Sequence, residues 1–530
     1  MFLTKVVIEN YRCLQRCTTA LNDKLNIIVG NNECGKSTLV EAIHLALSGY
    51  LNGRSIPTEL HPHLFNIATV REYIERLRAG RPAQPPQALI ELYFADHESL
   101  AHLKGTNNSS KDNCPGVKLL IEFDENYAEE YKAYVADPAV IRTVPVEYYA
   151  VRWRSFSDCD ITARSIPIKP SLIDASTIRN NAAASRYVVD IMKDSLTRKQ
   201  QVDLALAYRL MKDKFLQESR VEAINQALAA KKGSISDKAL TVSLDTSSRT
   251  SWESGVMPQL DDVPMPLVGK GEQNSVKIKL ALETFSESHL VLIEEPENHL
   301  SHSNLNTLIE HIASARGDRQ LIITTHSSFV LNKLGVENVL LFGRSKSLTL
   351  RDLTPKTQDY FLKLPGHDTL RLILAERAIL VEGPSDELIV QRAYFRRHGR
   401  MPLAAGVDVI TVNSLAFKRF LEIAKILGRR VDVVTDNDGD LHALERKYAE
   451  YFGQAGIEIR YDTDIAAPTL EPQLLKANGR AKINNILGKS FASDDELLNY
   501  MHSNKTEVAL RFFETGEEWI TPPYIEDAIA

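Results

Sequence analysis

The sequence predicts a mixed α/β protein with two sheet-containing blocks, because short apolar runs that end in polar residues alternate with amphipathic helical segments. This alternation fills the first 370 residues and starts again near Ala378. The first block is interrupted between Ser171 and Lys232, where Ala, Leu, Lys, Arg and Gln dominate and the apolar spacing is helical. We therefore expect four segments, bounded at 1–165, 166–240, 241–370 and 371–530.

The elements of the first block are predicted from their apolar runs. Leu25–Val29 is a short apolar strand, and Leu39–Leu47 after it has helical spacing. Ala88–Phe94 alternates as a strand of a meander. Leu290–Ile293 and Leu321–Thr325 are later strands, each followed by polar residues. The second block predicts a separate parallel sheet from Ala378–Val381, Val407–Val412, Val431–Thr435 and Ile457–Tyr461.

Length and composition exclude several classes of protein. A chain of 530 residues with 44% hydrophobic and 25% charged residues can bury several cores, so a largely disordered chain is excluded. Its five cysteines form no CxxC pair, which argues against a zinc ribbon and predicts a reducing, cytoplasmic environment. No run of about 18 apolar residues occurs, so no membrane partner is expected.

The net charge of −6 means that any nucleic-acid surface must be a local basic patch. Such a patch is predicted in the last segment, where aromatic residues accompany several cations, although solvated helix faces explain the same residues. The candidates are Arg396, Arg397, Arg400, Lys418, Arg419, Lys425, Arg429 and Arg430.

A phosphate-binding loop lies between the first apolar strand and its helix. The segment Gly30-Asn31-Asn32-Glu33-Cys34-Gly35-Lys36-Ser37, followed by Thr38, fits the pattern GxxxxGK[ST]. Backbone N–H groups of such a loop face phosphate, Lys36 supplies a cation and Ser37 an oxygen for Mg²⁺. A chance glycine turn is the alternative, and the strand and helix on either side disfavour it.

Three further features fit a nucleotide site. Glu294 and Glu295 end an apolar strand, where a metal-associated acid and a water-activating acid would lie, or they form a solvated acidic turn. His326 follows another strand and is either a sensor of the γ-phosphate or an ordinary loop residue. The glycines Gly269 and Gly271 precede a helix as a signature loop, or simply as a turn and cap.

A second acidic constellation lies in the last segment. Glu382 follows one strand, and Asp436 and Asp438 follow another, so the three carboxylates meet at one edge of a parallel sheet. Two Mg²⁺ or Mn²⁺ ions would offset their repulsion and support phosphodiester cleavage. The alternatives are solvent-facing turn acids or an EF-hand loop, and the latter fails because Lys447 occupies the twelfth position.

The order of phosphate-binding loop, Gly-rich segment, acidic strand end and His strand end resembles the ABC-type ATPases of chromosome maintenance and DNA repair. The resemblance implies that heads pair, with the signature of one subunit closing over the ATP of the other. Two departures stand out, since the signature Ser is absent at Val268 and Gly269, and Glu294 replaces the commoner Asp. Slow hydrolysis is expected.

The acids of the last segment resemble a Toprim domain, and the whole chain resembles the overcoming-lysogenization-defect (OLD) family of ATP-dependent nucleases, which includes the nuclease of the Gabija antiphage system. By this resemblance Glu382, Asp436 and Asp438 are the principal metal ligands. Asp386 and Glu471 match the second metal, and Lys505 matches a basic residue near the scissile phosphate. Without the resemblance, Glu471 is a helix-start acid and Lys505 a surface lysine.

The resulting hypothesis is a homodimeric, or higher homo-oligomeric, cytoplasmic ATPase fused to a two-metal Toprim endonuclease that acts on DNA. It implies ATP with one Mg²⁺, two Mg²⁺ or Mn²⁺ ions at the Toprim site, a role in antiphage defence or DNA repair, and a partner such as a helicase. One alternative is a strand-passing topoisomerase or a primase. The other is an ATP-gated DNA-binding scaffold whose acidic site is vestigial.

Overall fold

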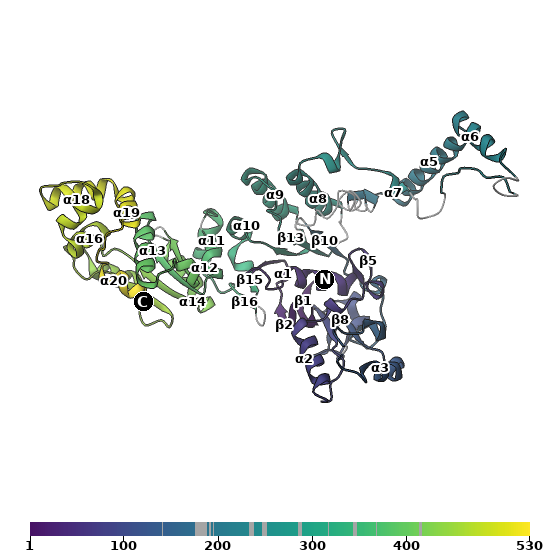
Figure 1. Cartoon of the computed structure of the whole chain (residues 1–530), viewed down its shortest axis with the longest axis horizontal. Helices are drawn as coiled ribbons and strands as arrows, with labels where there is room; N and C mark the ends of the chain where they lie inside the picture. The colour runs from purple at the N-terminus through teal and green to yellow at the C-terminus, as the bar shows by residue number, and fades with distance from the viewer. Residues whose placement is uncertain are drawn as a thin grey trace. The chain divides into compact units, whose positions relative to one another are not determined.

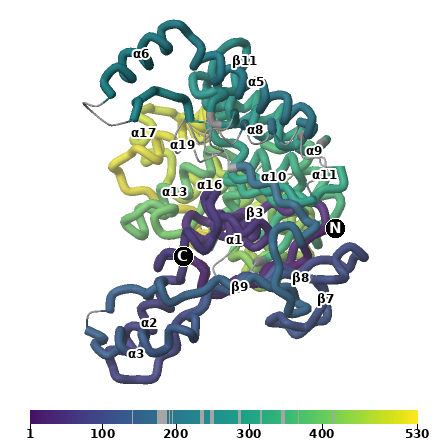
Figure 2. The backbone as a smooth tube through the Cα atoms, turned by 90° about the vertical axis from the view of Figure 1, so that its right-hand side faces the viewer, coloured from purple at the N-terminus to yellow at the C-terminus, as the bar shows by residue number. Residues whose placement is uncertain are grey.

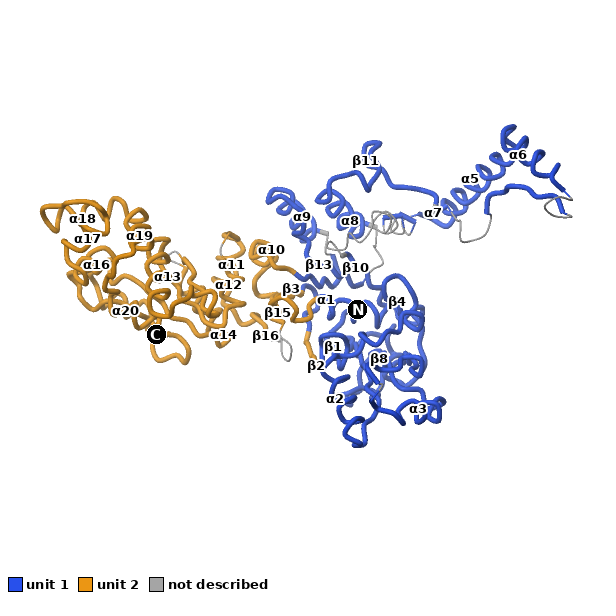
Figure 3. The backbone as a smooth tube through the Cα atoms, viewed as in Figure 1, with its two compact units in different colours: residues 1–15, 21–25, 37–324 blue, residues 16–20, 26–36, 325–530 orange. Residues whose placement is uncertain are grey.

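The structure is a computed structural model, and it divides into two compact units (Figure 3). Unit 1 comprises residues 1–15, 21–25 and 37–324, and unit 2 comprises residues 16–20, 26–36 and 325–530. The structure describes residues 1–139, 141–174, 188–189, 192–193, 196–232, 238–245, 252–284, 289–315, 317–342, 347–366, 368–412 and 416–530.

Unit 1 contains the antiparallel meander that the sequence predicts. Its central strand β6 (Ala88–Phe94) is buried along its whole length and pairs with β1 (Leu3–Tyr11) on one side and β8 (Cys114–Phe123) on the other. Strand β8 also pairs with β7 (Lys104–Gly105) and β9 (Tyr149–Ser155). Because both neighbours of β6 are hydrogen-bonded, its apolar residues form the middle of the core.

Two helices lie side by side at the edge of this meander (Figure 2). Helix α2 (Ile67–Arg78) begins at Asn66, whose side chain accepts hydrogen bonds from the N–H groups of Ala68 and Thr69. Tyr73 and Ile74 of α2 pack against α3 (Ala128–Val135). This small apolar cluster stabilises the two helices, and it contains no residue of the phosphate-binding loop.

A parallel sheet also belongs to unit 1. Strands β10 (Pro170–Asp174), β13 (Leu290–Glu294) and β14 (Gln320–Thr324) pair in register, so that Glu294 stands opposite Thr324. Strand β10 thus lies inside the segment that the sequence assigns to the helical insert. Helices α8 (Lys270–Thr284) and α9 (His302–Ala315) belong to this part of the unit. The short elements here are β4 (Tyr50–Leu51), β5 (Arg54–Ser55), α7 (Trp252–Gly255), β11 (Gln259–Leu260) and β12 (Val263–Pro264).

The insert is described as two helices, α5 (Arg198–Leu216) and α6 (Ser219–Ala229). Helix α5 begins with a capping box. The Thr197 hydroxyl accepts a hydrogen bond from the Gln200 N–H, and the Gln200 side chain accepts one from the Thr197 N–H. Part of the helical character predicted between Ser171 and Lys232, at residues 175–187, 190–191 and 194–195, falls outside the described residues.

Unit 2 begins with strand β3 (Leu25–Val29), most of which it contains, and helix α1 (Lys36–Ser48) then continues into unit 1. Strand β3 pairs in parallel with β15 (Val339–Phe342), which pairs with the antiparallel β16 (Ser347–Thr349). Helices α10 (Ser328–Leu334), α11 (Pro355–Lys363) and α12 (Thr369–Leu374) lead into the last sheet. The remaining strand of the opening segment is β2 (Leu14–Ala20).

The last sheet is parallel, as predicted, with the strand order β18-β17-β19-β20. These strands are β17 (Arg377–Val381), β18 (Val407–Thr411), β19 (Arg430–Val434) and β20 (Ile457–Arg460). Val381 and Val434 are partners in neighbouring strands, so the residues that follow them, Glu382 and Thr435, emerge together at one edge. This register brings the acidic constellation together.

Helices cover this sheet and extend beyond it to the end of the chain (Figure 1). They are α13 (Pro384–His398), α14 (Phe417–Leu427), α15 (Leu441–Tyr448), α16 (Leu470–Asn478), α17 (Arg480–Leu487), α18 (Asp494–Ser503), α19 (Lys505–Glu514) and α20 (Pro523–Ala528). Helices α13 and α14 end at Gly399 and Gly428, which adopt the left-handed conformation that terminates a helix. In the part of the chain that the structure describes, no helix is long and apolar enough to cross a membrane.

Candidate functional site

The phosphate-binding loop is shaped by glycines and by its own lysine. Lys36 is 7% exposed, and its ammonium donates hydrogen bonds to the carbonyl oxygens of Gly30, at 2.9 Å, and Asn31, at 3.2 Å. A Cβ at Gly30 would lie 2.5 Å from the carbonyl oxygen of Phe342, so a larger residue does not fit there. Gly35 has φ of +103°, which also favours glycine.

The other residues of this motif are more accessible. Asn31, Asn32 and Ser37 are exposed, and Thr38 is partly buried with its hydroxyl 3.2 Å from the thiol of Cys13. Their side chains are accessible at the start of α1, where the helix dipole favours an anion. These features are consistent with the predicted phosphate-binding loop, and the roles of its individual residues stay predictions.

The acidic strand end is a strained turn in unit 1. Glu294 ends β13 and is 8% exposed, whereas Glu295 begins the turn with φ of +45°. The Glu295 N–H donates to the carbonyl of Thr324 at 2.9 Å, and its carboxylate accepts from the Asn298 amide at 2.8 Å. Asn298 was not predicted from the sequence. Because a non-glycine residue seldom adopts this conformation, the fixed Glu295 carboxylate is a functional candidate.

The Gly-rich segment and His326 lie in different units. Gly269 directly precedes α8, and a Cβ at Gly271 would lie 2.4 Å from the His299 carbonyl oxygen, so close packing is enough to require glycine there. His326 lies in unit 2, two residues beyond the end of β14. These positions leave the roles of Gly269, Gly271 and His326 in nucleotide binding as predictions.

The second acidic site lies entirely in unit 2, at the carboxyl edge of the parallel sheet. The Glu382 carboxylate accepts hydrogen bonds from the Thr435 hydroxyl and, at 3.1 Å, from the Asp436 N–H. One carboxylate oxygen of Asp436, Oδ1, is buried and has no hydrogen-bond partner among the described residues. Asp386, on the first turn of α13, accepts from the Gly383 N–H at 3.0 Å. These three acids thus belong to one cluster.

Burial and mutual repulsion raise the pKa values of two of these acids. Burial, followed by the charges of Glu382 and Glu471, raises the pKa of Asp386 to about 7. Burial, followed by the charges of Asp386, Glu382 and Glu471, raises the pKa of Asp436 to about 8, and Lys505 opposes this shift. The five groups therefore share one electrostatic environment in which negative charge is poorly compensated.

Glu471 is contacted by a hydroxyl, an ammonium and an imidazole ring. It lies on the first turn of α16, is 3% exposed and accepts a hydrogen bond from the Thr469 hydroxyl at 2.9 Å. The ammonium of Lys505 is 3.2 Å from its carboxylate, and the His502 ring nitrogen is 3.4 Å away. The sequence predicted Glu471 and Lys505 but missed His502. This histidine lies near the end of α18, and Lys505 is the first residue of α19.

Asp438 is exposed in a turn that Asn437 anchors. Asp438 has φ of +49°, and its N–H donates to the Pro468 carbonyl at 3.2 Å. The amide of Asn437, which is 1% exposed, donates to the carbonyls of Asp462, at 2.8 Å, and Asp464, at 2.9 Å. Buried amides that bind turn carbonyls carry no sequence signature, so Thr435 and Asn437 were not predicted as supporting residues.

The acids of this cluster are oxygen donors of the type that a divalent cation prefers, although among the described residues they do not converge on one point. Among the described residues, no three or more His, Cys, Asp or Glu side chains are placed to hold one metal ion, and Glu382 accepts from the protein's own N–H and hydroxyl instead. The Asp436 oxygen without a hydrogen-bond partner and the raised pKa values of Asp386 and Asp436 nevertheless indicate that too little positive charge lies near these carboxylates. Hard oxygen donors of this kind are the ligands that Mg²⁺ and Mn²⁺ prefer.

Three arginines of the predicted basic patch bind backbone carbonyls within the fold. Arg396 donates to the Trp519 carbonyl at 2.5 Å, and Arg397 donates to the Glu526 carbonyl at 3.1 Å. Arg429 donates to the Ile373 carbonyl at 2.7 Å. These three arginines hold neighbouring segments of unit 2, but Arg396 and Arg397 remain exposed, so the basic patch stays a prediction.

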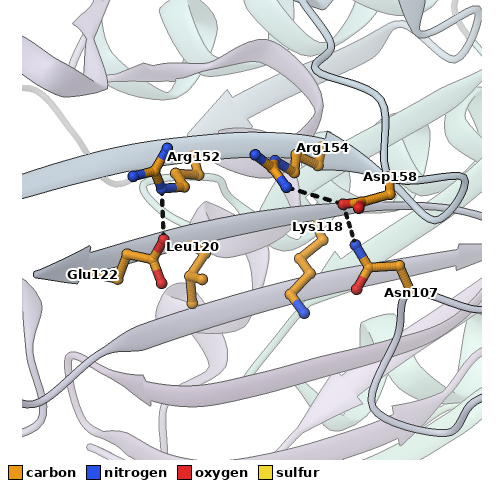
Figure 4. A pocket seen from close by; sticks show the side chains of 7 residues that line it. All are labelled: Asn107, Lys118, Leu120, Glu122, Arg152, Arg154 and Asp158. Carbon is orange, nitrogen blue, oxygen red and sulfur yellow. Dashed lines mark hydrogen bonds and ion pairs between the residues drawn. The ribbon is translucent and has the colours of Figure 1, made fainter. Parts of the chain in front are cut away.

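A hollow of about 340 Å³ lies on β8 and β9 in unit 1, and no predicted site residue lines it (Figure 4). Its charges are matched locally, since Arg152 is 2.7 Å from Glu122 and Arg154 is 3.0 Å from Asp158. The lining residues are Asn107, Lys118, Leu120, Glu122, Arg152, Arg154 and Asp158.

Comparison with known proteins identifies both halves of the chain. Residues 1–331 match the family model described as an AAA ATPase domain. Residues 373–438 match the model described as the overcoming lysogenization defect protein-like TOPRIM domain. The second range contains Glu382, Asp386, Asp436 and Asp438.

Individual proteins match this chain over a short stretch or at low sequence identity. The DNA replication and repair protein RecF of Bacillus mycoides (strain KBAB4) is 40% identical over 45 residues, which is 8% of this chain and 12% of that protein. The C-terminal region of the OLD protein of Xanthomonas campestris pv. campestris is 17% identical with a TM-score of 0.23, covering 29% of this chain and 90% of that one.

The SMC head domain from Thermotoga maritima is 12% identical with a TM-score of 0.32, covering 66% of this chain and 99% of that one. The family models, which match an ATPase domain and an OLD-like Toprim domain in this order, are the stronger finding. The chain therefore belongs to the OLD family of proteins that join an ATPase domain to a Toprim domain.

Proposed function

We propose that this protein is an ATP-binding DNA endonuclease that hydrolyses phosphodiester bonds at its Toprim site with two divalent cations. The observation that carries this proposal is the acidic cluster around the orphaned Asp436 oxygen, with Lys505 beside Glu471 at its rim. A fold alone does not need several buried carboxylates that repel one another, because each costs free energy unless a cation pairs with it.

The proposed roles are those that the family resemblance implies, and the shared electrostatic environment of Glu382, Asp386, Asp436 and Glu471 supports them. Glu382, Asp436 and Asp438 would hold one Mg²⁺ or Mn²⁺, and Asp386 and Glu471 would hold a second. The chemistry that such ions supply is activation of water and stabilisation of the leaving oxygen. Lys505 is half exposed, and we assign it to binding the scissile phosphate, with Glu471 fixing its position.

The ATPase domain supplies a separate set of proposed roles. Gly30, Asn31, Asn32 and Gly35 would present backbone N–H groups to phosphate, Lys36 would bind the outer phosphates, and Ser37 and Thr38 lie where a hydroxyl would reach Mg²⁺. Glu294 would support that ion, and Glu295, held by Asn298, would orient the attacking water. His326, Gly269 and Gly271 are assigned to the γ-phosphate.

The wider context is also part of the proposal. We expect a cytoplasmic homodimer or higher homo-oligomer that binds DNA and acts in antiphage defence or DNA repair, with a helicase or another defence protein as a partner. The proposed segments remain 1–165 and 241–370 for the ATPase, 166–240 for the insert and 371–530 for the Toprim nuclease. Each of these statements rests on family resemblance and on the sites described above.

A nicking experiment tests the central claim. Purified protein is incubated with supercoiled and linear DNA in Mg²⁺, Mn²⁺ or EDTA, with and without ATP. We expect metal-dependent nicking, and a loss of about 100-fold or more in Asp436→Ala, because that change removes both a metal ligand and the alignment of water. ATPase activity and DNA binding should persist in the variant.

The matched control is Glu458→Ala, which removes an exposed carboxylate of β20 outside the cluster and should leave nicking unchanged. Wild-type nicking by Asp436→Ala, in a preparation free of contaminating nuclease, would refute the Toprim assignment. A ladder of relaxed topoisomers would instead favour strand passage. DNA binding without any cleavage by the wild-type protein would favour the scaffold alternative.

A further inference from the structure

Tyr524 is a buried tyrosine that the proposed mechanism does not use. It lies on α20, is 6% exposed, and its hydroxyl donates a hydrogen bond to Oε1 of Gln473. Gln473 is 1% exposed and lies on the same helix, α16, as Glu471. Thus the last helix of the chain contacts the helix that carries a proposed metal ligand.

The tyrosine hydroxyl determines which way the Gln473 amide points. Because Oε1 accepts from Tyr524, Nε2 faces the carbonyl oxygen of Ala467 and donates to it at 3.1 Å. The reversed amide would place two oxygens against each other at Ala467, so this orientation is the favourable one. The Ala467 carbonyl also accepts from the Asn437 amide, at 3.4 Å.

Segment 462–468 is therefore held from two sides. On one side, Asn437 donates to its carbonyls, and the Asp438 N–H donates to Pro468. On the other side, Gln473 donates to Ala467. Since Asn437 separates Asp436 from Asp438, any shift of this segment moves the turn that carries both acids.

We propose that Tyr524 and Gln473 are positioning residues of the nuclease site, which fix segment 462–468 and, through it, the Asp436–Asp438 turn. This inference rests on the proposed function. The hydrogen bonds of the two side chains lead to Ala467 and so to Asn437. The charge of Asp436 also reaches Tyr524, since after burial it is the first of the charges that raise the pKa of that hydroxyl. Residues that orient metal ligands influence affinity strongly, because coordination tolerates little displacement of the donor atoms.

The test uses Tyr524→Phe, which removes one oxygen and keeps the ring. Mn²⁺ binding to the full-length protein is measured by calorimetry, and nicking is measured as a function of Mn²⁺ concentration. We expect about 10-fold weaker Mn²⁺ binding, the low end of the effect of residues that orient metal ligands. We also expect a higher Mn²⁺ requirement for nicking, near-normal nicking at saturating Mn²⁺ and unchanged ATPase activity. Gln473→Met should behave alike, and the double variant should lose no more than either single variant.

Tyr451→Phe is the matched control, since Tyr451 is 5% exposed and its hydroxyl donates to the Lys418 carbonyl at 3.2 Å. It should keep wild-type Mn²⁺ affinity. The inference is overturned if Tyr524→Phe and Gln473→Met both bind Mn²⁺ normally, or if Tyr451→Phe loses as much affinity. Asp436→Ala separates the two claims: normal Mn²⁺ binding and nicking by that variant would refute the proposed function itself.

Discussion

Asp386 and Asp436 are buried carboxyl groups whose raised pKa values, about 7 and about 8, make the charge of the Toprim site depend on pH near neutrality. An ordinary aspartate in the unfolded chain ionises near pH 4. Between about pH 4 and about pH 8, these two groups hold more protons in the folded protein than in the unfolded one. Its stability without metal must therefore fall as the pH rises through this window.

The first prediction concerns this window. We expect the EDTA-treated protein to lose on the order of 2–4 kcal/mol of Toprim stability between pH 5 and pH 8.5, since one pKa unit corresponds to about 1.4 kcal/mol and the two acids are coupled. Calorimetric melting at several pH values measures the loss. Mg²⁺ should restore more stability at pH 8.5 than at pH 5, and Asp436→Asn should flatten the dependence. A pH-independent melting temperature would contradict it.

A second residue-scale prediction concerns Glu295. Its φ of +45° is held by the hydrogen bonds to Thr324 and Asn298. We expect Glu295→Gln to bind ATP normally but to lose about 100-fold or more in turnover, because the amide cannot accept a proton from water. Asn298→Ala should lose less. Binding and steady-state hydrolysis distinguish these effects, and normal turnover in Glu295→Gln would move the role to Glu294 or Glu297.

At the scale of elements, apolar runs were sufficient to predict several of the buried strands, but not all of them. Leu290–Ile293 and Ala378–Val381 both proved to lie in parallel strands, because a strand covered on both faces must be apolar throughout. Strand β10 (Pro170–Asp174) escaped prediction because it overlaps the start of the segment whose composition and apolar spacing predict helix. The acids were predictable as ends of neighbouring strands, whereas Thr435 and Gln473 were not, since their partners are distant in sequence.

The third prediction concerns the insert. On α5, Val202, Leu206 and Leu210 are 57%, 54% and 61% exposed and recur every four residues, so they form one apolar stripe. We expect this stripe to hold the homodimer. Replacing residues 198–229 by a short linker, which spares β10, should give monomers in light scattering. Leu206→Glu with Leu210→Glu should do the same without deletion, whereas persistent dimers would place the interface elsewhere.

At the scale of the whole molecule, the phosphate-binding loop and the Toprim acids belong to different sheets. The proposed nucleotide site and the proposed Toprim site each bind their own cation, so neither site needs a ligand from the other. We therefore expect Lys36→Ala to abolish tight ATP binding but to retain metal-dependent nicking within about 10-fold of wild type. Filter binding and the nicking assay measure the two activities in one preparation. Complete loss of nicking would mean that the sites are obligately coupled.

Side chains of helix α13 bind the backbone of residues 515–530 and should protect these residues from proteolysis. Arg392 and Arg396 bind the carbonyls of Thr515 and Trp519, His398 binds that of Ile529, and Arg377 of β17 binds those of Ala528 and Ala530. Proteases bind substrates as extended strands, and a backbone whose carbonyls are already engaged cannot adopt that shape without first detaching. In limited proteolysis, the fragment that contains the Toprim sheet should therefore keep residues 515–530.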